Sequence, residues 1–113
     1  MLQTFNLILI KPTHYDDDGY PIQWVRSFIP SNSLACVYGI AADACDRQVL
    51  GPDVSVDIQT FDETNATVPV NRLIRQIRRD GGRALVCMVG VQSNQFPRAI
   101  DLSQPFLEAG IQV

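Results

Sequence analysis

The residues best suited to bind a small ligand lie together in the stretch Gly90–Ala99, which reads GVQSNQFPRA. Its four consecutive polar residues, Gln92–Gln95, come directly after the apolar run Ala84–Val91. Amide and hydroxyl groups are unfavourable to bury without hydrogen-bond partners. The loop therefore either binds a polar, amide-decorated ligand or caps the next helix through Ser93 or Asn94. The residue types alone favour neither alternative.

A second polar group, Asp16-Asp17-Asp18-Gly19, could indicate a calcium loop or the acidic pocket of a receiver domain. A calcium hand needs flanking helices and a glutamate at the end of its loop, and neither is found here. A receiver domain carries its acceptor aspartate after the third strand, where this chain has Val89–Ser93 without an aspartate. We therefore expect a solvated acidic turn, and a receiver-like signalling domain is a minor alternative.

The cysteines and the single histidine argue against a metal centre in this chain. Cys36, Cys45 and Cys87 are an odd number, and no CxxC or CxxxCxxC spacing occurs, so neither a zinc site nor an iron–sulfur cluster is expected. Reduced thiols in the core of a cytoplasmic protein are the simpler interpretation. His14 is the only histidine. We assign no metal ligand and no catalytic residue.

The composition is that of one folded domain spanning residues 1–113. Of the 113 residues, 46% are hydrophobic and 19% charged, which excludes a disordered chain. A net charge of −3 argues against a nucleic-acid partner. Apolar runs such as Leu7–Ile10 are too short to span a bilayer, so no membrane is expected.

Stretches of high β-propensity predict the strands that position these loops. Phe5–Ile10 and Ala84–Val91 are nearly continuous apolar runs, typical of strands buried on both faces in a parallel sheet. Val54–Phe61 alternates apolar and polar residues, which predicts an edge strand. Ile111–Val113 looks like the beginning of a fourth strand. Between the first two of these stretches in sequence order, Ile22–Ile29 contains both apolar and polar residues, with Trp24 and Phe28 as expected packing anchors.

Three helices are expected between the strands. The first starts after Pro30 with Ser31 or Ser33 as its N-cap. The second covers about 68–80, and its Arg72, Arg75, Arg78 and Arg79 form a solvated face; the third covers about 98–108, where Pro105 should kink or divide it. The first helix carries a stripe at helical spacing that should face the core: Leu34, Val37, Tyr38, Ala41, Ala42 and Cys45.

The order β-α-β-α-β-α-β predicts an α/β fold with a doubly wound parallel sheet, a flavodoxin-like Rossmann variant truncated after about four strands. In such sheets ligands bind beyond the carboxyl ends of the strands, beside the point where the strand order reverses. The loops at those ends are 12–21, 62–65 and 90–97. No GxGxxG and no P-loop occurs, so a dinucleotide-binding Rossmann domain is not expected.

Three motifs, IPSNSL at Ile29–Leu34, DET at Asp62–Thr64 and GVQSNQFPRA at Gly90–Ala99, give the chain a family resemblance. Over nearly all of Leu7–Val113 it resembles the cobalamin-binding-type domain that precedes radical S-adenosylmethionine domains in bacterial enzymes. The resemblance implies a corrin lying over the carboxyl ends of the strands. It also implies a parent enzyme, a methyltransferase or related radical enzyme, whose C-terminal domain binds a 4Fe-4S cluster and S-adenosylmethionine in cis.

The resemblance implies which residues would contact cobalamin in the parent: Val91, Gln92, Ser93, Asn94, Gln95, Thr13 and His14. The family's DxHxxG signature is out of register around His14, so no cobalt-ligating role is assigned to that residue. We expect the chain to be an N-terminal fragment with no catalysis of its own. Strands beyond Val113 would complete the pocket for the nucleotide tail, so the fragment should bind cobalamin weakly or not at all.

Two further expectations accompany this interpretation. The domain could instead have lost cobalamin and act as a degenerate Rossmann-like module for interaction or substrate shaping. If the sheet is truncated at Ile111–Val113, its exposed edge favours a homodimer.

Overall fold

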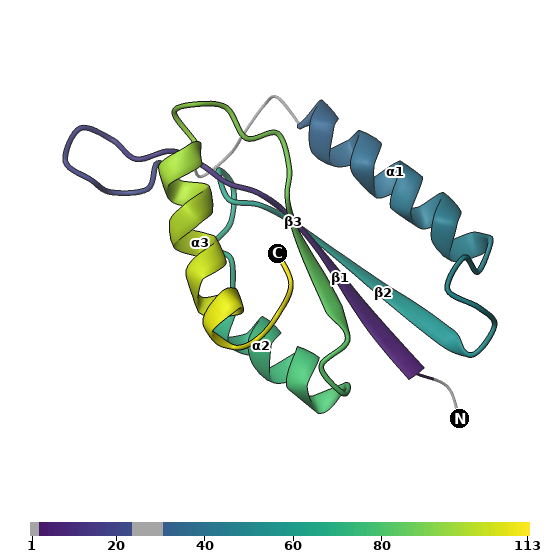
Figure 1. Cartoon of the computed structure of the whole chain (residues 1–113). Helices are drawn as coiled ribbons and strands as arrows, with labels where there is room; N and C mark the ends of the chain where they lie inside the picture. The colour runs from purple at the N-terminus through teal and green to yellow at the C-terminus, as the bar shows by residue number, and fades with distance from the viewer. Residues whose placement is uncertain (1–2, 24–30) are drawn as a thin grey trace.

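The computed structural model describes residues 3–23 and 31–113 (Figure 1). The expected packing anchors Trp24 and Phe28 lie outside the described residues. Strands and helices alternate along the chain, in the order β1 (Gln3–Lys11), α1 (Asn32–Asp46), β2 (Val54–Asp62), α2 (Val70–Arg79), β3 (Ala84–Met88) and α3 (Phe96–Glu108). The molecule is therefore an α/β protein, as predicted.

The three strands form one parallel sheet in the order β2-β1-β3. On β1, Leu7 pairs with Ile58 of β2 on one side and with Leu85 of β3 on the other. The predicted edge position of β2 is thus confirmed. The prediction of about four strands is wrong for the described residues. After Gly110 the described chain makes an isolated parallel bridge between Gln112 and Leu85 and not a ladder.

The core lies on one side of this sheet, which we call the α2–α3 face. Because side chains alternate along a strand, Ile8, Ile10 and Val86 share this face, and all three are fully buried. Helices α2 and α3 cover it (Figure 1). The buried side chains that these helices contribute are Leu73, Ile74, Ile77, Leu102 and Phe106.

The opposite side, the α1 face, is covered by α1 alone (Figure 1). Of its side chains, Leu9 on the central strand is buried, whereas Leu7, Ile58, Leu85 and Cys87 are half-buried. None of the residues of α1 is buried, so the expected core-facing stripe is wrong in that respect. Its members are only half-buried, and Tyr38 is 46% exposed. One helix cannot cover three strands, and an apolar cavity of about 240 Å³ lies between α1 and the sheet.

The incomplete cover of the sheet by α1 also explains why the expected burial of the third strand is wrong. Ala84–Val91 was expected to be buried on both faces, but within β3 only Val86 is buried. Leu85 and Cys87 point to the α1 face, where they remain half-exposed. Apolar composition predicted the strand correctly but not the extent of its burial.

Local signals predicted the helix ends well. The Ser31 side chain accepts a hydrogen bond from the Leu34 amide at 3.1 Å, which confirms Ser31 as the N-cap of α1. Helix α2 ends at Arg79, just before Gly81-Gly82, where both residues have positive φ and the Gly82 amide donates to the Ile77 carbonyl.

Helix α3 differs from the expectation at Pro105. The helix runs undivided from Phe96 to Glu108, so of the two effects expected at Pro105 the division is wrong, and the kink stays a prediction. Proline removes a single amide donor, and the helical bonding resumes when the Ala109 amide donates to the Pro105 carbonyl. In the described residues, no helix is long and apolar enough to cross a membrane.

Candidate functional site

The loops that follow β1, β2 and β3 meet at the carboxyl ends of the strands. Helix α1 leads away on one face of the sheet and α3 on the other (Figure 1). The strand order therefore reverses between β1 and β3, and the loops after these two strands flank the crevice where parallel sheets bind ligands. The predicted site residues lie in these two loops.

A buried ion pair holds this end of the sheet together. Glu63, directly after β2, is 1% exposed, and its carboxylate accepts bonds from Nε and Nη2 of Arg98 at 3.0 and 2.6 Å. The same carboxylate accepts the Thr13 amide at 3.1 Å. Hydrogen bonding to Glu63 raises the pKa of Arg98, so the guanidinium stays protonated. The pair thus joins the loops after β1 and β2 to the first turn of α3.

Tyr15 extends this cluster to the surface. Its hydroxyl lies between Asp101 and Arg98, and the guanidinium carbon lies 5.6 Å from the ring centroid, within cation–π range. Burial, and then the hydrogen bond to Asp101, raise the pKa of Tyr15. The phenol therefore remains protonated near neutral pH and acts as a donor rather than a base.

Two of the predicted site residues are part of this internal framework. Thr13 is fully buried, and its hydroxyl donates to the Ile22 carbonyl at 2.6 Å. Gln95 is 7% exposed, donates to the Pro12 carbonyl at 2.9 Å and accepts the Gln92 amide at 2.9 Å. Both side chains fix the loops. That they also contact a cofactor stays a prediction.

The remaining predicted residues lie in the loops after β1 and β3. Gln92, Ser93 and Asn94 are exposed, whereas Val91 and His14 are half-buried. We call Gln92–Asn94 the rim. Its cofactor contacts, like those of Val91 and His14, stay predictions.

The loop that carries the rim passes close to the start of α1. Gly90 has φ +68°, and a Cβ placed there would come within 3.4 Å of Ser33 Cβ. A side chain at this position would be strained by its backbone, and its Cβ would be in van der Waals contact with Ser33. Glycine therefore allows the loop after β3 to approach α1.

Sequence reasoning missed Glu63, Arg98 and Tyr15 as residues of this region. A usable signal existed: Glu63 directly follows one strand, and Arg98 belongs to the first turn of the helix after another. The carboxyl ends of parallel strands lie at one edge, so opposite charges there can pair. Among the described residues, no group of three or more His, Cys, Asp or Glu could hold a metal ion.

The acidic turn at Asp16–Gly19 has a local structural role. Asp16, Asp17 and Asp18 are exposed, and one carboxylate oxygen of Asp16 accepts the amides of Asp18 and Tyr20, each at 2.9 Å. The aspartate thus stabilises its own turn.

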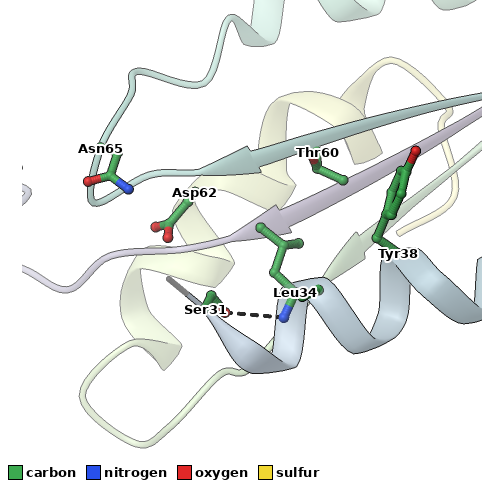
Figure 2. Close-up of a pocket in the computed structure, with 7 residues that line it drawn as sticks. Ser31, Leu34, Tyr38, Thr60, Asp62 and Asn65 are labelled. Carbon is green, nitrogen blue, oxygen red and sulfur yellow. Dashed lines mark hydrogen bonds between the residues drawn. The ribbon is translucent and has the colours of Figure 1, made fainter. Parts of the chain in front are cut away.

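A separate groove lies beside the end of β2 (Figure 2). It has a volume of about 370 Å³ and lies between the first two turns of α1 and the strand. Its lining combines apolar and polar groups: Ser31, Leu34, Ala35, Tyr38, Thr60, Asp62 and Asn65.

Comparisons of the chain with protein-family models, with curated proteins and with solved structures give no match.

Proposed function

We propose that this chain is the cobalamin-binding-type module of a larger radical S-adenosylmethionine enzyme in the cytoplasm, with the flavodoxin-like strand order 2-1-3. The proposal is supported above all by the rim, Gln92–Asn94, which is exposed in the loop after β3, at the carboxyl ends of the strands and next to the point where the strand order reverses. This is the position at which open parallel sheets bind ligands.

The chemistry of the rim suits a ligand decorated with amides. Corrin side chains are amides, and the rim offers amide and hydroxyl groups without a charge. Two of the charged side chains at this end of the sheet, Arg98 and Glu63, are paired with each other and are not available to a ligand. The residues present therefore fit the periphery of a corrin.

The role of this chain's residues is to hold and orient the cofactor. Gln92, Ser93 and Asn94 would bond the corrin amides, while Thr13 and Gln95 keep the two loops in place. When bound, cobalamin supplies a cobalt centre that can carry a methyl group for the parent enzyme. The 4Fe-4S cluster and S-adenosylmethionine belong to its C-terminal domain, and this chain has no catalysis of its own.

Equilibrium dialysis with hydroxocobalamin tests the proposal in the longer protein. The double variant Ser93→Ala/Asn94→Ala should weaken binding, because each lost hydrogen bond costs about 0.5–1.5 kcal/mol. Gln104→Ala, an exposed amide on α3, is the matched control and should bind like the unaltered protein. His14→Ala should leave the visible spectrum of the cobalt unchanged. Equal affinity in the double variant would contradict the assignment of the rim.

A degenerate module for interaction or substrate shaping is the second candidate. It is favoured by the self-sufficiency of the framework: Thr13, Gln95 and Glu63 find their partners within the chain. Such a module would show no saturable uptake of hydroxocobalamin by the longer protein, although its loops would be equally ordered.

A further inference from the structure

The groove beside β2 is distinct from the rim and has its own chemistry. It lies where α1 covers the edge strand, whereas the rim follows β3 on the other side of β1. Figure 2 shows Tyr38 and Thr60 at one end of the groove, Asp62 and Asn65 at the other, and Leu34 between them. An inference from this groove does not depend on cobalamin binding.

The polar end offers a fixed carboxylate. One oxygen of Asp62 accepts the amide and the hydroxyl of Thr64, at 3.1 and 2.6 Å. Both bonds use Oδ1, so Oδ2 can accept from a ligand without loss of the turn. The side chains of Ser31 and Asn65 line the same end. Acceptors and donors placed side by side suit neighbouring hydroxyl groups better than a single ammonium group.

The other end is suited to a flat ring. Tyr38 is 46% exposed although it belongs to the stripe that faces the sheet, and Leu34 and Ala35 continue the apolar wall. Exposed aromatic rings stack well on planar ligands. A volume of about 370 Å³ is near the lower limit for ligand pockets, which limits the ligand to a small molecule.

We propose that this groove binds a nucleoside, with the base against Tyr38 and Leu34 and the ribose hydroxyls on Asp62 and Asn65. An acidic residue that accepts ribose hydroxyls beside the end of a strand is a known solution in nucleotide-binding parallel sheets. The negative charge of Asp62 disfavours a phosphate on the 2′ or 3′ oxygen, so a ribose with both hydroxyls free is preferred at this end.

The test is a titration of the ¹⁵N-labelled 113-residue chain with adenosine, followed by amide chemical shifts. We expect saturable shifts at Leu34, Tyr38 and Asn65 and none at Gln92–Asn94. The analogue 2′,3′-dideoxyadenosine keeps the base and lacks both hydroxyls. Because hydrogen bonds to a charged group are strong, it should bind at least about tenfold more weakly.

Variants assign the two ends of the groove. Asp62→Asn keeps an oxygen for Thr64 but removes the charge, and it should weaken adenosine binding about tenfold with little effect on the dideoxy analogue. Asp53→Asn, exposed just before β2, is the matched control and should bind normally. Exposed Asn65→Ala gives a second test at the polar end if Asp62→Asn unfolds. Absence of saturable shifts, shifts centred on the rim, or equal affinity for both ligands would overturn the proposal.

Discussion

The two faces of the sheet contain similar residues but are buried to very different extents. On the α2–α3 face, Leu73 and Phe106 are fully buried, and both helices contribute to one core. On the α1 face the covering helix is longer, 15 residues against 10 in α2, yet it buries none of them. Burial therefore depends on how many helices cover the strands, and not on the length or apolar content of one helix.

Deleting a large side chain from each face should give the largest contrast. Phe106→Ala removes a fully buried ring and should lower the free energy of unfolding by about 3–5 kcal/mol. Tyr38→Ala, on the α1 face, should cost less than about 1 kcal/mol, because much of its ring is already in contact with water. Urea denaturation followed by circular dichroism measures both. Equal losses would show that the α1 face is as well packed as the core.

The sequence predicts the features that depend on neighbouring residues. Ser31 as a cap, Gly81-Gly82 as a stop and the alternation along Val54–Phe61 are all local, and the structure confirms them. The exposure of Leu85 could not be predicted, because it depends on how far α1, which is distant in sequence, covers β3.

The candidate site likewise contains residues that local sequence predicts and residues that depend on distant partners. The loop at Gln92–Asn94 could be placed from the end of its strand alone. The Glu63–Arg98 pair joins residues far apart in sequence, so its only signal was that both follow strands whose carboxyl ends lie at the same edge of the sheet. The burial of Gln95 depends likewise on the distant Pro12 carbonyl.

Removing the buried charge between the loops should give the next largest effect. Glu63→Gln leaves Arg98 without its carboxylate, and hydrogen bonds to charged groups contribute about 1.5–3 kcal/mol. We expect a loss of about 2–3 kcal/mol in the free energy of unfolding, since Arg98 keeps some contact with water. Urea denaturation again supplies the measurement.

A partner variant shows whether the loss comes from the pair. In Glu63→Gln/Arg98→Met no unpaired charge remains, and stability should partly return. Full additivity of Glu63→Gln and Arg98→Met would contradict a direct interaction between the two side chains.

Removing the cap of α1 should have a smaller and more local effect. Ser31→Ala deletes the acceptor for the Leu34 amide, a loss of about 1 kcal/mol for a typical N-cap. Hydrogen exchange should accelerate in α1 and stay unchanged in α2, because α1 contributes no buried residue to the core. Ser33→Ala, an exposed serine two residues later, is the control and should change neither.

The incompletely covered α1 face also predicts that the protein self-associates. Substitutions that weaken this association should change the free energy of unfolding only slightly. Exposed Ile40 lies on α1, and exposed Val49 and Leu50 lie shortly after it. Among the described residues, β3 is bridged on its outer side at Leu85 alone. We expect a concentration-dependent dimer by light scattering, which Val49→Asp/Leu50→Asp should weaken. The control is Phe96→Asp, an exposed aromatic residue at the start of α3, which should not alter the dimer. A monomer at every concentration would contradict the prediction.

The smallest expected effect is a difference in the rate of thiol alkylation, which reports how well the α1 face shields a cysteine from solvent. Cys87 is half-buried on this face, and burial raises the pKa of its thiol, whereas Cys36 is exposed on α1. Only the thiolate reacts with iodoacetamide, and each unit of raised pKa lowers the thiolate population about tenfold below the pKa. At pH 8, mass spectrometry of labelled peptides should therefore find Cys36 modified before Cys87, and in urea the two rates should converge. If a partner covers the α1 face, Cys87 should become slower still. Equal rates in the folded protein would mean that this face gives Cys87 no more protection than solvent does.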